Sequence, residues 1–270
     1  MNLDIAGKAA LVTGASGGIG SATARLLVQE GVRVGVHGRD FKRTHAVATE
    51  IAHTGGTAHA LTADLSDETA VEALADAALK ALGQVDILVC NAGGRAKLAQ
   101  VGWEESTLEN YRETFQINLG YSVRLIQRLA PAMRERGYGR IVLIASAAGL
   151  QPMGNQPDYG AAKAAMVSLA VSTSKWLRGC GVTINAISPG AIMTPQLESY
   201  LTGVARKKNW PGDMATIERN AAREMMKIPV GHVGRPEDIA AMVAYLASPF
   251  GAFIHGANLH IDGGVIGTVT

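Results

Sequence analysis

The sequence predicts an α/β protein built as one doubly wound domain, with a mostly seven-stranded parallel sheet flanked by helices. Short apolar runs alternate along the chain with longer stretches whose apolar residues recur at helical spacing. The apolar runs are continuous, as expected for strands that are buried on both faces of a parallel sheet. Repeated βα units also fit an eight-fold barrel, but the glycine-rich turn after the first apolar run favours the open sheet.

Each expected strand is a short run of apolar or β-branched residues. The expected strands are Ala9–Val12, Arg33–Val36, Thr57–Leu61, Ile87–Cys90, Arg140–Ala145, Thr183–Ile187 and Asn258–Ile261. The expected helices include Ala22–Gln29, Ala70–Leu82, Leu108–Arg136 and Ala161–Arg178. No linker, repeat or low-complexity tract interrupts the pattern, so we expect residues 1–270 to form a single domain.

The composition is that of an ordinary globular protein, with 47% hydrophobic residues, 18% charged residues and a formal net charge of +2. This balance favours neither nucleic-acid nor membrane binding. The two cysteines, Cys90 and Cys180, lie far apart, and Met1–Asp4 lacks the features of a signal peptide, so we expect a cytoplasmic protein. The seven histidines show no metal-ligand spacing, and we expect no metal site.

The segment Thr13–Gly20 joins the first expected strand to the first expected helix. A strand that turns sharply into a helix presents unpaired N–H groups and the positive end of the helix dipole, which together bind phosphate. Glycines at 14, 18 and 20 would allow the tight turn and the close approach of a pyrophosphate. The spacing is Gly-x-x-x-Gly-x-Gly, which differs from the more common Gly-x-Gly-x-x-Gly. Taken alone, the motif also fits a flexible turn in any α/β protein.

Tyr159 and Lys163 stand four residues apart, so on a helix their side chains would be neighbours. A free tyrosine has a pKa of ~10 and is a poor base at neutral pH. A nearby ammonium would favour the phenolate, lower the pKa of Tyr159 and make it a usable general acid and base. Lys163 can also donate hydrogen bonds to the ribose hydroxyls of a cofactor. An isolated Tyr-x-x-x-Lys pair is a weak signal, because such pairs also occur on solvated helices.

Further polar residues follow the ends of expected strands. Ser146 comes directly after Arg140–Ala145, where its hydroxyl could hold a substrate carbonyl oxygen or simply cap a turn. Asn91-Ala92-Gly93 follows another strand, where a close backbone approach to a cofactor is expected. Asn118 falls in the middle of an expected helix, so it either faces solvent or makes local hydrogen bonds.

Together these motifs resemble those of the short-chain dehydrogenase/reductase family, over a span from about Gly7 to Gly264. The resemblance implies a Rossmann-like fold, oxidoreductase activity and a nicotinamide dinucleotide cofactor. The implied catalytic set is Asn118, Ser146, Tyr159 and Lys163. The expected cofactor-binding residues are Gly14, Ser16, Gly18, Ile19, Gly20, Arg39, Asp64, Leu65, Asn91, Ala92, Gly93, Tyr159, Lys163, Pro189, Gly190, Ile192 and Thr194, with Asp64 placed near the adenine ring.

The resemblance also implies a mechanism of hydride transfer between the nicotinamide and a substrate carbon. In reduction, Tyr159 donates a proton to the forming alkoxide, and Ser146 donates a hydrogen bond to the same oxygen. Lys163 tunes Tyr159 and anchors the ribose, and Asn118 helps to hold a water that relays protons to the lysine.

The end of the second expected strand bears on the choice between NADP and NAD. An acid at this strand end would bind a ribose 2′-hydroxyl and repel a 2′-phosphate. Gly38 occupies the place of that acid and Arg39 follows it, which favours NADP(H) because a guanidinium binds phosphate well. NAD(H) stays possible, since a shift by one residue would make Asp40 the ribose ligand.

We therefore expect NADP(H)-dependent interconversion of a carbonyl and a secondary alcohol. A 3-oxoacyl thioester reductase is one specific case, although Gly94-Arg95-Ala96-Lys97 stands where Ile-Thr-Arg-Asp is frequent in such reductases. An NAD-dependent alcohol or polyol dehydrogenase is an alternative, with sugar, steroid and xenobiotic substrates all open. A non-catalytic dinucleotide sensor is a further alternative, but it would need no complete catalytic set.

Residues 190–227 are expected to form a lid or loop region beside the binding edge. Its basic run Arg206-Lys207-Lys208 either contacts an anionic substrate or lies at a solvated helix end. The resemblance also implies a homotetramer or homodimer, which the apolar positions of Leu108–Arg136 and Ala161–Arg178 would accommodate.

Overall fold

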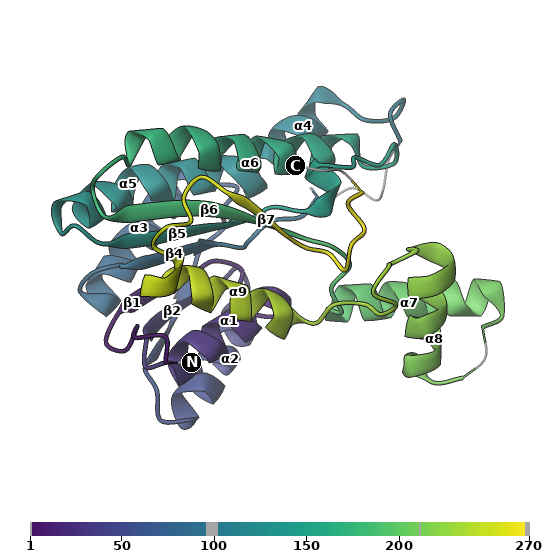
Figure 1. Ribbon diagram of the computed structural model, residues 1–270, viewed down its shortest axis with the longest axis horizontal. Helices are drawn as coiled ribbons and strands as arrows, with labels where there is room; N and C mark the ends of the chain where they lie inside the picture. The colour runs from purple at the N-terminus through teal and green to yellow at the C-terminus, as the bar shows by residue number, and fades with distance from the viewer. Residues whose placement is uncertain (1, 96–101, 211, 268–270) are drawn as a thin grey trace.

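The computed structural model describes residues 2–95, 102–210 and 212–267 and confirms the expected α/β fold (Figure 1). Seven parallel strands form one sheet in the order β3-β2-β1-β4-β5-β6-β7. The strands are β1 (Ala9–Val12), β2 (Arg33–Gly38), β3 (Ala58–Thr62), β4 (Ile87–Cys90), β5 (Gly139–Ile144), β6 (Val182–Pro189) and β7 (Asn258–Ile261). The strand order reverses between β1 and β4, and doubly wound sheets bind ligands beyond the carboxyl ends of their strands at this point.

Helices cover both faces of the sheet (Figure 1). One face packs against α3 (Glu68–Leu82), α5 (Tyr121–Glu135) and α6 (Pro157–Trp176), and the other packs against α1 (Gly18–Gln29), α2 (Phe41–His53) and α9 (Pro236–Ala247). Alternate residues of β1 enter the two cores. This burial on both sides explains why the strands are apolar throughout.

Helices α1, α3 and α6 begin earlier than expected, another expected helix is divided, and two of these differences concern the candidate site. The expected helix Leu108–Arg136 is divided into α4 (Leu108–Phe115), a π-helical turn at Gln116–Gly120 and α5. Such turns are frequent at functional sites. The other helix, α6, begins at Pro157 rather than at Ala161, because proline suits a first helical position. Tyr159 therefore lies in the first turn of α6.

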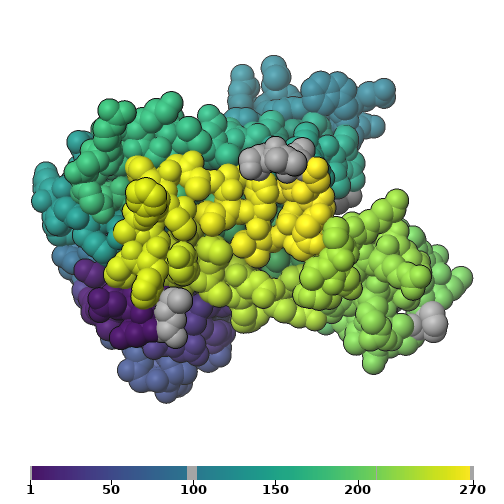
Figure 2. All heavy atoms as spheres, in the orientation of Figure 1, coloured from purple at the N-terminus to yellow at the C-terminus, as the bar shows by residue number. Residues whose placement is uncertain are grey.

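The expected lid region is mostly helical. It contains α7 (Pro195–Lys208) and α8 (Met214–Asn220), followed by a second π-helical turn at Ala221–Met225. These elements share a small apolar cluster and project as a lobe from the side of the molecule (Figure 2). Arg206-Lys207-Lys208 forms the last turn of α7, where cations suit the helix dipole. Ala96, Lys97 and Pro211, which fall in the segments singled out from the sequence, lie outside the described residues.

Candidate active site

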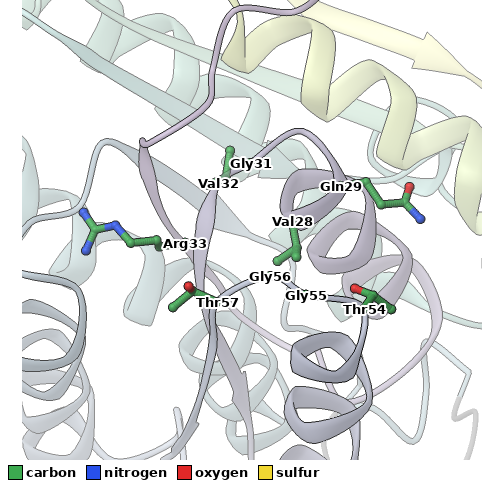
Figure 3. Close-up of a pocket in the computed structure, with 9 residues that line it drawn as sticks. All are labelled: Val28, Gln29, Gly31, Val32, Arg33, Thr54, Gly55, Gly56 and Thr57. Carbon is green, nitrogen blue, oxygen red and sulfur yellow. The ribbon is translucent and has the colours of Figure 1, made fainter.

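The expected site residues gather at the carboxyl ends of neighbouring strands. The segments that begin at Thr13, Asn91, Ser146 and Gly190 follow β1, β4, β5 and β6, which are adjacent in the sheet. A pocket of about 500 Å³ lies elsewhere, between the ends of α1 and α2 and the starts of β2 and β3 (Figure 3). Because that pocket is at the amino-terminal edge of the sheet, we do not assign it to the chemistry.

The glycine-rich turn packs tightly against the loop after β4. Gly14 has a φ of 65°, and a Cβ built on it would lie 2.9 Å from the Cα of Ala92. A Cβ on Gly20 would collide with the carbonyl oxygen of Gly14. No side chain in the described part of the chain caps the N-terminus of α1, so its first N–H groups face the turn uncapped. This turn fits a pyrophosphate, because those donors and the helix dipole favour an anion.

Hydrogen bonds hold the loop after β4 against the glycine-rich turn, and they involve Thr13, Asn91 and Tyr121. The Asn91 side chain donates hydrogen bonds to the carbonyls of Thr13 (2.9 Å) and Gly14 (3.2 Å). The Thr13 hydroxyl accepts from the N–H groups of Asn91 and Ala92. The Tyr121 hydroxyl donates to the carbonyl of Ala92 at 2.7 Å. Tyr121 is fully buried, and burial raises the pKa of its phenol, which keeps it neutral as a donor.

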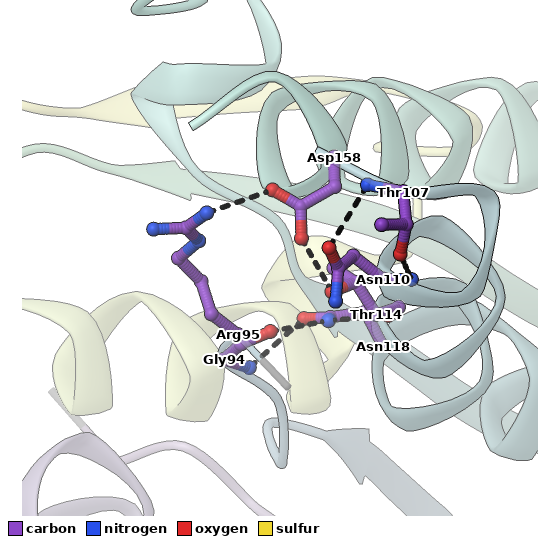
Figure 4. A network of polar contacts seen from close by, with 7 residues as sticks. All are labelled: Gly94, Arg95, Thr107, Asn110, Thr114, Asn118 and Asp158. Atoms are coloured by element: carbon purple, nitrogen blue, oxygen red, sulfur yellow. Dashed lines mark hydrogen bonds and ion pairs between the residues drawn. The ribbon is translucent and has the colours of Figure 1, made fainter. Parts of the chain in front are cut away.

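Asn118 is fully buried, so it does not face solvent, and its side chain bonds both to the nearby Thr114 and to the distant Gly94. Its amide nitrogen donates to the carbonyls of Gly94 and Thr114, both at 2.7 Å, and its amide oxygen accepts from the Gly94 N–H at 3.1 Å (Figure 4). The side chain thus holds Gly94 from both sides. Its expected part in a water relay stays a prediction.

Ser146, Tyr159 and Lys163 meet between the end of β5 and the first two turns of α6. The Ser146 side chain lies beside the Tyr159 hydroxyl, close enough to lower the pKa of that phenol. The Lys163 side chain is 3% exposed, and its Nζ lies 5.7 Å from the centroid of the Tyr159 ring. Nζ donates to the carbonyl of Ile144 at 2.8 Å. A Cβ on Gly93 would lie 3.2 Å from Nζ, so the loop after β4 reaches this group.

Burial governs the protonation of this trio. Desolvation lowers the pKa of Lys163 to about 7, and the nearby Cys90 opposes this shift. Desolvation also raises the pKa of Tyr159, while the neighbouring Ser146 side chain lowers it. The sequence pattern predicts a lowered pKa for Tyr159, and that prediction is wrong for the protein alone, because desolvation of the buried phenol outweighs the groups that favour the phenolate.

A second polar network joins the loop after β4 to the start of α6 (Figure 4). Asp158, which directly precedes Tyr159, is 2% exposed. Its carboxylate accepts from the Thr114 hydroxyl at 2.6 Å and pairs with Arg95 at 3.2 Å. This network ties α4, α6 and Arg95 together beside Tyr159. Nothing in the local sequence around Asp158 predicts these contacts, because Thr114 and Arg95 are distant in the chain.

His37 connects the glycine-rich turn to the loop after β3. It is 2% exposed, and its Nδ1 accepts from the Gly14 N–H at 3.3 Å. Its Nε2 lies 3.2 Å from the carbonyl of Ala63 and donates to it in this tautomer. Burial lowers the pKa of His37 to about 4. These contacts of His37 could not be predicted from the sequence, because Gly14 and Ala63 are distant from it in the chain.

Because of His37, we expect the unfolding free energy of the protein to decrease at acidic pH. The pKa is lowered in the folded state, so the neutral imidazole stabilises the fold above the unfolded pKa of ~6.5, and this contribution is lost as the pH falls through about 4. We expect the difference in unfolding free energy between wild type and His37→Leu to shrink by about 3 kcal/mol across this window. Denaturant titrations at several pH values measure it, with the exposed His53 replaced as the control. A constant difference across the window would contradict the expectation.

The remaining expected cofactor residues line the same edge. Ser16 lies against Gly38, since a Cβ on Gly38 would be 2.8 Å from the Ser16 Cβ. A Cβ on Gly18 would be 3.2 Å from the Thr194 Cγ2, which joins the segment after β6 to the turn. The others occupy the first turn of α1 (Ile19), the loop after β3 (Asp64, Leu65) and the end of β6 with its following loop (Pro189, Gly190, Ile192). Asp64 accepts hydrogen bonds from Ser66, so its expected contact with adenine stays a prediction.

Known proteins resemble this chain over nearly its whole length, which includes the residues of the candidate site. The family model described as enoyl-(acyl carrier protein) reductase matches residues 14–266, which is nearly the entire chain. The chain belongs to the short-chain dehydrogenase/reductase family. It is therefore an oxidoreductase of a family whose members use nicotinamide dinucleotides.

Three members of the short-chain dehydrogenase/reductase family illustrate the similarity. L-rhamnose 1-dehydrogenase (NAD(P)(+)) of Azotobacter vinelandii is 36% identical over 263 residues, covering 96% of each chain. L-sorbose reductase from Gluconobacter frateurii, solved with NADPH and L-sorbose, superposes with a TM-score of 0.92 at 28% identity over 100% of both chains. A 7alpha-hydroxysteroid dehydrogenase solved with NADH and 7-oxo glycochenodeoxycholic acid has a TM-score of 0.85 at 32% identity, covering 97% of this chain and 96% of the other.

Two further properties of this short-chain dehydrogenase/reductase concern what it could bind. Over residues 2–95, 102–210 and 212–267, no group of three or more His, Cys, Asp or Glu side chains is placed to hold a metal ion. Within the same part of the chain, none of the helices combines the length and the apolar character that crossing a membrane requires.

Proposed function

We propose that this protein reduces a carbonyl compound to a secondary alcohol, or catalyses the reverse oxidation, with NADP(H). The observation that carries the proposal is the meeting of Ser146, Tyr159 and Lys163 at the sheet edge, directly beside the loop that packs on the glycine-rich turn. A phosphate-binding turn and a proton donor at one edge are what hydride transfer to a carbonyl requires. We also propose that the chain forms one domain and that residues 190–227 act as a lid over the site.

In the proposed reaction, the bound nicotinamide supplies or accepts the hydride. Tyr159 donates a proton from its hydroxyl to the substrate oxygen, and Ser146 orients that oxygen by a hydrogen bond. Lys163 restores the charge balance when Tyr159 gives up its proton, because an ammonium beside a phenolate stabilises it. Its pKa of about 7 lets it hold or release a proton near neutral pH. Asn118 keeps Gly94 in place, and through it the loop that faces Lys163.

The end of β2 supports a preference for NADP(H). Gly38 cannot be an acid, since even a Cβ would collide with the Thr44 hydroxyl. Asp40, the alternative ribose ligand, is the N-cap of α2, where its carboxylate accepts from the Arg43 N–H at 2.8 Å. Arg39 is exposed, and the Arg43 guanidinium lies beside the glycine-rich turn, 3.3 Å from a Cβ built on Gly17. Two cations at this strand end would attract a 2′-phosphate.

The known relatives act on different substrates, so they support carbonyl and alcohol chemistry without selecting one compound. The names given above include a sugar dehydrogenase, a ketose reductase and a hydroxysteroid dehydrogenase. A 3-oxoacyl thioester substrate stays a specific alternative. The dinucleotide-sensor alternative predicts cofactor binding with no turnover.

A kinetic comparison of NADPH and NADH over sugars, polyols, steroid ketones and 3-oxoacyl thioesters tests the proposal. We expect wild type to prefer NADPH, and Arg39→Leu to raise KM for NADPH about tenfold with little change for NADH, because one charge-assisted phosphate contact is lost. Arg178→Leu serves as the control, because Arg178 is exposed and lies between the end of α6 and the start of β6, at the amino-terminal edge of the sheet. Binding of NADPH without oxidation by any ketone would favour the sensor instead.

We also infer a homotetramer or homodimer that associates through α5 and α6. A groove of about 400 Å³ crosses these helices and is lined by Val123, Ile126, Pro131, Leu169 and Trp176, among others. Trp176 and Val171 are exposed on the same helix pair, and such exposed apolar groups favour association. Size-exclusion chromatography with light scattering should give a mass of two or four chains, and Trp176→Glu should lower it. A monomer for wild type would contradict the inference.

A further inference from the structure

We propose that Arg95 selects the substrate, and that it favours carbonyl compounds that carry a hydroxyl group near the reacting carbon. This inference rests on the proposed function and names the substrate class for it. Arg95 follows Gly94 in the loop after β4, and its side chain is only 15% exposed.

The first observation is that most of the guanidinium has no partner. Nη2 pairs with Asp158, while Nε and Nη1 are buried without a hydrogen-bond partner among the described residues. Figure 4 shows the unpaired terminal nitrogen on the side of the guanidinium that faces away from Asp158. Buried donors without acceptors are uncommon in folded proteins, because each one forfeits its hydrogen bonds to water. Oxygen atoms of a bound substrate would satisfy them.

The second observation is where Arg95 lies. Asn118 clamps Gly94, the residue before it, and Gly93 reaches Lys163. Asp158, the partner of Arg95, directly precedes Tyr159 in the first turn of α6. The guanidinium is thus held by the residue that directly precedes the proposed proton donor. In the proposed complex, the substrate carbonyl oxygen lies on Tyr159 and Ser146, and its neighbouring atoms extend toward Arg95.

The charge of the pair decides the chemical class. Asp158 is 2% exposed and also accepts from the Thr114 hydroxyl, so its carboxylate is fixed beside Arg95. The positive charge of Arg95 is therefore already balanced. Such a pair offers hydrogen-bond donors without excess charge, which suits a neutral hydroxyl oxygen better than a carboxylate. The substrate class that fits is a hydroxylated ketone or aldehyde, or the corresponding polyol.

The test compares three four-carbon ketones with NADPH: erythrulose, butanone and the keto acid acetoacetate. We expect Arg95→Met to lower the ratio of kcat/KM for erythrulose over butanone by at least about tenfold, because buried donors discriminate strongly against a substrate that lacks the acceptor. Arg112→Met, which changes an exposed arginine of α4 that pairs with Glu109, should leave the ratio unchanged. Arg95→Lys keeps the charge and should lower the ratio by less, and it serves if the methionine variant folds poorly.

Each other outcome has a distinct meaning. If Arg95 acted only by fixing Asp158 and the start of α6, its replacement would slow both ketones by the same factor, and an unchanged ratio would overturn the inference. If Arg95→Met lowered kcat/KM for acetoacetate alone and left the ratio of erythrulose to butanone unchanged, Arg95 would recognise a negative charge instead of a hydroxyl group. That result would also overturn the inference. Reduction of butanone by wild type with no preference for erythrulose contradicts the inference alone. Failure of wild type to reduce any ketone in the wider panel contradicts the proposed function as well.

Discussion

Replacing Tyr159 with phenylalanine is expected to lower kcat for carbonyl reduction by about 10²–10⁴-fold. The variant keeps the ring that packs beside Lys163 and loses only the hydroxyl that lies beside Ser146. Without that hydroxyl, the forming alkoxide has no positioned proton donor. Because the ring is retained, the dissociation constant for NADPH should change by less than about threefold. Steady-state rates and cofactor fluorescence titrations give the two quantities.

Tyr245 offers a matched control for this experiment. It lies on α9, which covers the opposite face of the sheet from α6, so Tyr245→Phe should leave kcat unchanged. Full activity in Tyr159→Phe would refute the proposed mechanism.

Lys163→Met is expected to abolish turnover and yet to stabilise the fold at neutral pH. Burial lowers the pKa of Lys163 from 10.5 to about 7, which means that the fold disfavours its charge by an amount on the order of a few kcal/mol. Methionine has a similar length and carries no charge, although the hydrogen bond to Ile144 is lost at a cost of about 1 kcal/mol. We expect a net rise in the unfolding temperature of a few degrees.

The pH dependence separates this effect from general repacking. Between the folded pKa of about 7 and the unfolded value of about 10.5, the unfolded chain binds the proton more tightly, so the contribution of Lys163 to stability rises with pH. That contribution is lost as the pH falls through about 7. Denaturant titrations across this window should show the slope in wild type and in Lys175→Met, an exposed lysine of the same helix, but not in Lys163→Met. A less stable Lys163→Met at pH 7 would contradict the expectation.

Some features of the candidate site could be predicted from residue spacing in the sequence, and others depend on tertiary packing. Tyr159 and Lys163 could be paired from the sequence, because a four-residue spacing places side chains on one helix face. The π-helical turn around Asn118 could not be predicted, since it accompanies the hydrogen bonds of Asn118 to Gly94 and Thr114. Gly94 is distant in sequence, and only the folded chain brings it there.

The choice between NADP and NAD at the end of β2 also could not be made from the sequence alone. In the sequence, Arg39 and Asp40 pointed to different cofactors, and the register could not be decided. In the structure, Asp40 is the N-cap of α2. A capping role depends on where the helix starts, and that start is set by the packing of α2 on the sheet as much as by local propensity.

The sequence by itself determined the fold class, the family motifs and the order of the strands along the chain, because burial on both faces requires continuous apolar runs and a phosphate turn requires glycine. The tertiary structure alone decided the contacts of His37, Tyr121, Arg95 and Asp158. It also decided that burial lowers the pKa of Lys163 to about 7. The physical reason is common to all of these: hydrogen bonds between distant segments and desolvation arise only when the strands and helices close around the residue, and no local pattern records them. The Thr13–Gly20 turn could be predicted from the sequence, but the residues that hold it in place could not.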